Sequence, residues 1–229
     1  MGLDIGAAWC GTDLGDHRPC HGIYERYPCN TLPALDNSQF TGAFQWLGDL
    51  GEVVPGQLAR LQELDEKLAA KGLALPQDVV SFFLSSNLHD ALDEVSVTNC
   101  RSYLSEPLPS PVEPGAYLIC FLSDLLDSIF WYLYLRPSGH LFVVHSHLDY
   151  EYEYGAESDI FEEPQSDLDD VAAQRTAIFW CAPSFEHFAY RFWLENRLWR
   201  AIHDSDAQPL DAAMQEYLDH YKPLSHSGA

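Results

Sequence analysis

The chain has 229 residues, enough for one large domain or for one domain with an appendage. Hydrophobic residues make up 47% of it and aromatic residues 13%, so a buried core can offset the loss of chain entropy, and a wholly disordered chain is excluded. Twelve Lys and Arg against 35 Asp and Glu leave a net charge of −23. This charge repels nucleic acid and anionic membranes and attracts basic partners. The alternative is that it serves solubility alone.

The compartment is predicted from what the sequence lacks. Residues 1–15 contain no Lys or Arg and no apolar run long enough for the core of a signal peptide. No uncharged apolar stretch reaches the roughly 20 residues that a membrane span needs. The six cysteines are spread too thinly for a disulfide scaffold, so we expect them to be reduced. These features predict a cytoplasmic protein.

Three parts of the chain differ in composition. Residues 1–55 are rich in Gly, Pro, Asn and Asp, which favour turns, but they also carry several aromatic residues. We therefore expect an irregular N-terminal appendage packed on the main body. Residues 56–222 are expected to form the main domain, and residues 223–229 a frayed tail.

Helices are predicted at both ends of the main domain. Leu58, Leu61, Leu64 and Leu68 lie on one stripe at helical spacing, and Pro76 suits the first turn of a second helix. Ser184 is expected to cap a long helix that ends near residue 202, and a last helix is expected to begin near residue 209.

Strands are predicted between these helices, at residues 117–122, 129–135, 141–146 and 178–182. Residues 136–139 suit a type I turn that closes an antiparallel hairpin. The order of elements predicts an α+β fold, with a central antiparallel sheet of about five or six strands flanked by N-terminal and C-terminal helices. We expect helices to cover one face of this sheet, while the other face can remain open for function.

Three segments in this order resemble a known family. They are residues 75–83 (LPQDVVSFF), residues 131–135 (WYLYL) leading into Gly139, and residues 182–188 (APSFEHF) followed by 191–196 (RFWLEN). Together, over roughly residues 57–203, they resemble the SUKH superfamily, which includes fungal cell-wall-assembly regulators and many bacterial immunity proteins. The first 55 residues match no part of that pattern, and the acidic stretch described next is longer than usual.

The resemblance implies a single SUKH-like α+β domain without a catalytic site or cofactor. In bacteria, members mostly neutralise polymorphic toxins, many of which are nucleases or deaminases. The resemblance therefore implies a non-enzymatic immunity protein that occludes the surface of a cognate basic toxin. A regulatory scaffold, as in the fungal relatives, is the alternative from the same family.

The acidic residues concentrate in one stretch. Residues 102–174 contain one Arg and fourteen Asp or Glu, and residues 150–154 alternate Tyr with Glu. In a strand, this alternation would place the three Tyr on one face and the two Glu on the other. Such a surface could imitate a nucleic-acid backbone inside a basic cleft. A solvated acidic loop is the alternative interpretation. The partner-binding residues predicted here are Asp149, Glu151, Tyr152, Glu153, Glu157 and Asp159.

A second candidate surface is one face of the strand at residues 129–135. Phe130, Tyr132 and Tyr134 share this face, and we expect it to be the exposed one because a buried Tyr needs a partner for its hydroxyl. These three residues complete the predicted partner-binding set. The alternative is that both faces of the strand pack in the core.

One cluster offers an enzymatic alternative. His145, His147 and Asp149 imitate most of the His-x-His-x-Asp-His motif of metallo-hydrolases, but Tyr150 replaces the last His. A catalytic zinc needs three well-placed ligands, and alternate positions of a strand point to opposite faces unless a turn intervenes. We therefore predict no metal, keeping a metal-dependent hydrolase as the alternative function.

Overall fold

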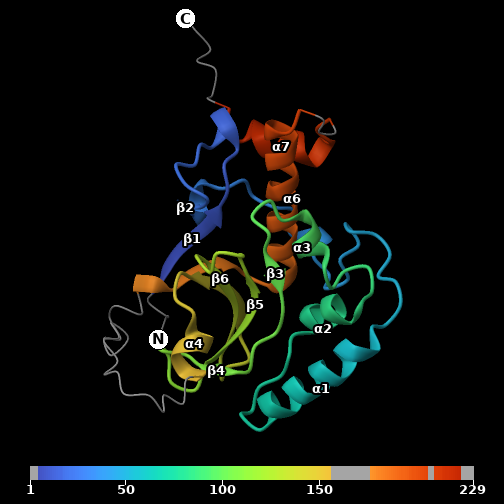
Figure 1. The fold of residues 1–229 in the computed structure, drawn as a ribbon, viewed down its shortest axis with the longest axis vertical. Helices are drawn as coiled ribbons and strands as arrows, with labels where there is room; N and C mark the ends of the chain where they lie inside the picture. The colour runs from blue at the N-terminus through green and yellow to red at the C-terminus, as the bar shows by residue number, and fades with distance from the viewer. Residues whose placement is uncertain (1–4, 156–175, 206–208, 223–229) are drawn as a thin grey trace, which may run out of the picture.

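The computed structural model describes residues 5–155, 176–205 and 209–222 (Figure 1). Over these residues the chain forms an α+β fold. Its strands are β1 (Gly6–Gly11), β2 (Glu25–Pro28), β3 (Arg101–Ser102), β4 (Leu108–Pro109), β5 (Tyr117–Ser123), β6 (Phe130–Leu135), β7 (Leu141–Ser146) and β8 (Phe179–Ala182). Its helices are α1 (Pro55–Ala69), α2 (Gln77–Leu84), α3 (Ala91–Val95), α4 (Tyr150–Gly155), α6 (Phe185–His203) and α7 (Ala212–Asp219).

The strands form one mixed sheet of eight, in the order β2-β1-β8-β7-β6-β5-β3, with β4 paired to β5 outside this path. This number exceeds the five or six predicted, and the sheet is not wholly antiparallel because β1 runs parallel to β8 at Gly6 and Ala7. The additional strands lie in residues 6–28 and 101–109. They were missed because two-residue strands and Gly-containing segments carry little of the strand pattern.

The four predicted strands are confirmed as β5, β6, β7 and β8. The hairpin between β6 and β7 is also confirmed, since the amide of Gly139 donates to the carbonyl of Arg136 at 2.9 Å. Residues 1–55 are less irregular than expected because they supply β1 and β2. The domain boundary at residue 56 stays a prediction, and residues 223–229 lie outside the described residues.

The predicted helices are present as α1, α2, α6 and α7, but Leu58 of the predicted apolar stripe is exposed. Helix α1 buries Leu61, Leu64 and Leu68. Helix α6 begins after Ser184, whose Oγ accepts a hydrogen bond from the amide of His187 at 3.3 Å. Helix α7 begins at Ala212, three residues later than predicted, because Asp211 and not Pro209 provides its cap.

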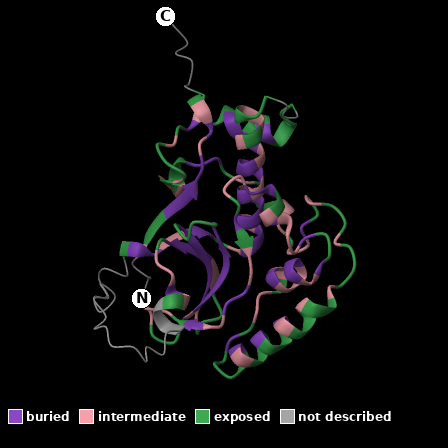
Figure 2. Ribbon diagram, viewed as in Figure 1, coloured by how far each residue is buried: buried purple, intermediate pink, exposed green. Residues whose placement is uncertain are grey.

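Both faces of the sheet are covered, so the second face does not remain open, and the alternative in which both faces of the central strand pack in the core is the one observed (Figure 2). On one face, α1, α2, α3 and α6 enclose the larger core around Trp131 and Phe188. On the other face, Tyr132 and Tyr134 belong to a second core together with Tyr150, which begins α4. This second layer explains why every residue of β6 is buried.

The N-terminal segment is fastened to α6 by a buried ion pair. The guanidinium of Arg18 donates to both carboxylate oxygens of Glu195, each at 2.6 Å. Trp9 donates its indole N–H to the same carboxylate at 2.8 Å, and Tyr217 of α7 donates its hydroxyl. The chain passes so close to this pair that a Cβ on Gly11 would lie 2.5 Å from an Arg18 nitrogen. Only glycine fits there without a shift of the ion pair.

A second buried carboxylate of α6 holds the loop before α1. Glu186 accepts hydrogen bonds from the amides of Gly42 and Phe44 and from the indole N–H of Trp46. Phe44 has a positive φ of 48°, an uncommon conformation for a bulky residue. The carboxylate of Glu186 therefore satisfies the backbone N–H donors of a strained turn.

Replacing Glu186 by Gln is expected to lower the free energy of unfolding by about 1–3 kcal/mol, because the amide nitrogen of Gln faces donors that the carboxylate satisfied. Urea denaturation measures this loss. Hydrogen exchange at the amides of Gly42 and Phe44 should accelerate in the variant. Glu216→Gln, an exposed substitution on α7, is the matched control. Unchanged exchange at both amides would contradict the anchoring role.

Candidate functional site

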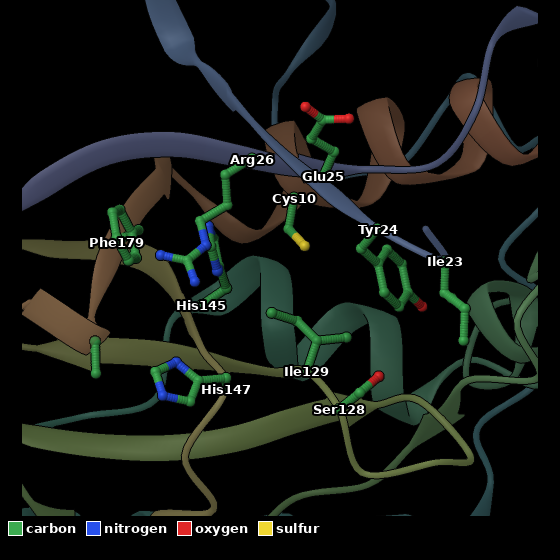
Figure 3. A pocket seen from close by; sticks show the side chains of 11 residues that line it. Cys10, Ile23, Tyr24, Glu25, Arg26, Ser128, Ile129, His145, His147 and Phe179 are labelled. Carbon is green, nitrogen blue, oxygen red and sulfur yellow. The ribbon is translucent and has the colours of Figure 1, made fainter. Parts of the chain in front are cut away.

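A pocket of about 320 Å³ opens where β1 separates from β8 (Figure 3). β1 pairs with β8 only at Gly6 and Ala7, and from Ala8 onward it pairs with β2 instead. The divergence of the two strands leaves a crevice. Five segments line it: β1, residues 23–26 at the start of β2, the end of the β5–β6 turn, residues 145 and 147, and residues 177 and 179 at β8.

His145 forms the inner wall of the pocket. Its Nε2 donates to the carbonyl oxygen of Ala8 at 3.1 Å, so in the neutral ring the lone pair lies on Nδ1. Burial, with 1% of the residue exposed, lowers the pKa of His145 to about 3. At physiological pH the ring of His145 is therefore neutral, and its hydrogen bond links β7 to β1.

Arg26 supplies a positive charge at the same pocket. Its guanidinium carbon lies 4.5 Å from the ring centroid of Phe179, against which the ring of His145 also stacks. Gly6 makes room for that ring, because a Cβ there would lie 2.8 Å from Phe179. In Figure 3, the side chain of Arg26 reaches towards His145, whereas the carboxylate of Glu25 points away from both. Arg26 thus directs a positive charge into the pocket, although Glu25 also belongs to its lining.

The three residues of the alternative metal-dependent function, His145, His147 and Asp149, do not assemble as a three-ligand site. His145 and His147 line the same pocket, because β7 ends at Ser146 and the chain then bends. Asp149, however, does not line this pocket, and its Oδ1 accepts hydrogen bonds from the backbone amides of Glu151 and Tyr152 at the start of α4. Among residues 5–155, 176–205 and 209–222, no group of three or more His, Cys, Asp and Glu could hold a metal ion.

Nucleophilic chemistry has little support from the side chains of the pocket. Burial raises the pKa of the Cys10 thiol far above its ordinary value, which disfavours the thiolate. Ser128 donates its hydroxyl to Asp124 at 2.6 Å and has no hydrogen bond to a histidine among the described residues. The pocket is better suited to binding than to acyl transfer.

A Ser–His contact does occur elsewhere, at the start of α6. The hydroxyl of Ser184 lies 2.7 Å from Nδ1 of His187, and Nε2 of that ring lies 3.0 Å from Oδ1 of Asn37. The same Ser184 oxygen also accepts the amide of His187 as the helix cap. We therefore interpret this relay as a helix cap extended by a histidine that fastens the 3-10 turn at Asn37–Gln39.

The predicted aromatic surface is buried, which corrects the expectation that it faces a partner. Phe130, Tyr132 and Tyr134 all lie in the second core. Each tyrosine hydroxyl has a local partner, since Tyr132 donates to the carbonyl of Leu148 at 2.9 Å and Tyr134 contacts Ser110 at 2.8 Å. The need for a hydroxyl partner is therefore met inside the protein.

The alternating Tyr and Glu residues form a helix, so the predicted strand geometry is also wrong. In α4, Tyr150 is buried against Tyr132, while Tyr152 is 74% exposed. Asp149 and Glu151 are partly exposed beside it. Glu153 lies within α4, and Glu157 and Asp159 lie outside the described residues. The structure thus keeps Asp149, Glu151 and Tyr152 adjacent at the start of α4, and this helix covers the β6 face through Tyr150.

Comparisons with family models, with curated proteins and with solved structures each found no match to this chain. Membership of the SUKH superfamily therefore stays a prediction. No helix among the described residues is long and apolar enough to cross a membrane.

Sequence reasoning missed Arg26, Tyr24 and Ser128, which line the pocket. They come from loops and from a short strand without a motif. The pairing of β1 with β2 and β8 brings Tyr24 and Arg26 near His145, and the pairing of β6 with β7 brings Ser128 there. For the helix α4, by contrast, one signal was visible in the sequence. Asp149, an N-cap residue type directly before the Tyr and Glu run, indicates the start of a helix.

Proposed function

We propose that the protein acts by docking a basic partner protein, and that this partner is a cognate toxin that it neutralises. The observation that carries the proposal is the start of α4, where the exposed ring of Tyr152 lies beside Glu151 and Asp149. Tyr is enriched among the residues that anchor protein interfaces, and carboxylates beside it attract a cationic surface. The SUKH resemblance supports the immunity role, with a regulatory scaffold as its alternative.

The balance of charges on the described surface supports a basic partner. Several Arg and Lys residues already pair with carboxylates of the protein: Arg18, Arg60, Lys67, Arg136, Arg197 and Lys222. Many exposed acidic residues have no such ion pair among the described residues: Asp16, Asp36, Asp49, Glu52, Asp65, Glu66, Glu94, Asp127 and Glu216. The described surface therefore carries an excess of negative charge, which favours association with a basic partner over an acidic one.

The carboxylates at α4 repel one another. Partial burial and the negative charges of Asp149 and Glu106 raise the pKa of Glu151 above its ordinary value. A cationic group docked at this point would relieve the repulsion as well as contact Tyr152. We therefore define Asp149, Glu151 and Tyr152 as the α4 docking surface.

The experiment tests neutralisation and its location together. The gene adjacent to that of the protein is tested as the toxin gene. The two genes are co-expressed, and the growth of the host cells is measured. We expect the wild type to restore growth, and the double variant Glu151→Gln, Tyr152→Ala to restore it at least about tenfold less well, since truncated interface anchors typically cost 2 kcal/mol or more. Glu216→Gln, an exposed charge removal on α7, is the matched control and should protect as the wild type does.

Binding of the purified pair distinguishes the possible failures. The association rate should fall steeply as salt is raised, because the proposed steering is electrostatic. If the two proteins do not bind, the immunity proposal is wrong. If they bind but the α4 double variant binds normally, the location is wrong. Leu126→Ser then tests the β5–β6 turn, where Leu125 and Leu126 are the exposed apolar alternative.

A further inference from the structure

The pocket between β1 and β8 has features that docking at α4 does not require. It is preformed, because ladder hydrogen bonds hold β1, β2, β7 and β8, and the bond from His145 to Ala8 spans the crevice. Its volume of about 320 Å³ lies at the lower end of the range for small-molecule sites. A small ligand therefore fits it better than a protein segment does.

Arg26 is the main polar feature of this pocket. No carboxylate of the described residues forms an ion pair with Arg26, although the protein carries a large excess of carboxylates. Phe179 holds the guanidinium through a cation–π contact, which reduces the side-chain entropy that a ligand would have to remove. The fork of N–H donors is thus available and positioned for an anion.

The protonation of the two histidines affects how much positive charge the pocket presents to a ligand. Burial keeps His145 neutral, and partial burial together with the charge of Arg26 lowers the pKa of His147. Near neutral pH the pocket therefore offers one fixed positive charge and no second one from its histidines. A single guanidinium matches a carboxylate with one negative charge better than it matches a doubly charged phosphate group.

Apolar groups next to Arg26 can accept the rest of the ligand, although Glu25, Ser128 and His147 also line the pocket. Ile23, Ile129, Ala177 and the rings of Tyr24 and Phe179 line the space next to Arg26. The hydroxyl of Tyr24 is already bonded to Thr98, so the ring presents its apolar part to the pocket. A compact aromatic or aliphatic body would bury these surfaces on binding.

We propose that this pocket binds a small organic carboxylate, with the acid group on the guanidinium of Arg26 and the apolar body against Ile129 and Phe179. The net charge of −23 opposes any anion at long range, but at about 0.15 M salt this repulsion is screened within roughly 8 Å. The contact with Arg26 then decides the binding. We expect an affinity on the order of 1 mM for a ligand of this size.

Benzoate is the test ligand, titrated into the full chain while NMR shifts of the pocket amides are followed. Benzamide is its neutral counterpart, acetate lacks the apolar body, and phenylphosphonate carries the alternative acid group. We expect benzoate to shift the amides of Ile129 and Phe179 and to bind at least about tenfold more tightly than the other three. Absence of binding by benzoate, or binding of benzamide or phenylphosphonate as tight as that of benzoate, would overturn the proposal.

Variants then assign the contact. Arg26 is exposed, so Arg26→Gln should fold, and it should weaken benzoate at least about tenfold because the charge-assisted hydrogen bonds are lost. Arg26→Lys keeps the charge but not the fork, and an intermediate affinity is expected. Lys71→Gln, an equal charge change on an exposed residue after α1, should bind within about twofold of the wild type. Equal weakening by Lys71→Gln and Arg26→Gln would refute a specific site.

Discussion

Replacing Glu195 by Gln is expected to lower the free energy of unfolding by about 3–5 kcal/mol, the largest loss that we predict for a single substitution. Arg18 and Glu195 are 5% and 2% exposed, so removal of the carboxylate leaves a buried guanidinium without its counter-charge. The variant also weakens the contacts from Trp9 and Tyr217. Urea denaturation at pH 7, with Glu216→Gln as the control, measures the loss.

A double-mutant cycle separates the ion pair from general packing. Arg18→Met alone should also destabilise the protein, because it leaves the carboxylate of Glu195 buried and unpaired. The double variant Arg18→Met, Glu195→Gln should lose clearly less than the sum of the two single losses. Additive losses, or a loss below about 1 kcal/mol for Glu195→Gln, would contradict the view that this pair fastens the N-terminal segment to α6.

The pair also illustrates what sequence reasoning could not see. Burial alone would raise the pKa of Glu195, but the charge of Arg18 and its hydrogen bonds outweigh burial, and the pKa is lowered. In the sequence, the two residues are 177 positions apart and lie in segments of different composition. No local pattern links them, so the N-terminal segment was predicted as an irregular appendage although it completes the sheet.

The elements that could be predicted have their signals within a short window. The strands β5, β6 and β7 are apolar runs bounded by turn residues, and Ser184 caps α6 through its own hydroxyl. The burial of the β6 tyrosines could not be predicted from such a short window. It depends on α4 and on residues 103–112, which cover the second face and supply partners such as the carbonyl of Leu148.

One part of the candidate site could be predicted from the sequence, and the other part could not. Glu151 and Tyr152 were predicted as part of a docking surface from composition, and the structure places Tyr152 in the open. Their helical arrangement was missed because the alternation imitates a strand. The pocket at Arg26 was missed altogether, since the parallel pairing of β1 with β8 joins residues more than 170 positions apart.

His145 is expected to make the stability of the protein depend on pH between about 7.5 and 4.5. Its folded pKa of about 3 lies below the ordinary value of 6.5, so the unfolded chain takes up a proton that the folded protein refuses. The stabilisation is therefore fully present above pH 6.5 and is lost as the pH falls towards 3. The loss sets in near pH 6.5 and then proceeds at about 1.4 kcal/mol per pH unit, so between pH 7.5 and 4.5 it amounts to about 2.7 kcal/mol.

His145→Gln isolates this contribution, because Gln can donate to the carbonyl of Ala8 and does not titrate. Other groups with shifted pKa values contribute too: the lowered pKa values of His147 and His187 act in the same direction, whereas the raised pKa of Asp78 acts in the opposite one. The informative quantity is therefore the difference in unfolding free energy between wild type and variant at each pH. This difference should shift by about 2.7 kcal/mol in favour of the variant between pH 7.5 and 4.5.

The exposed His140, in the β6–β7 hairpin, provides the matched control, and His140→Gln should leave the pH profile of the wild type unchanged. A constant difference between wild type and His145→Gln across this range would show that the folded protein accepts the proton on His145. That outcome would mean that β1 separates from β7 on acidification, because the buried ring can take up a charge only if water reaches it. The same titration therefore measures how firmly the bond to Ala8 closes the wall of the pocket.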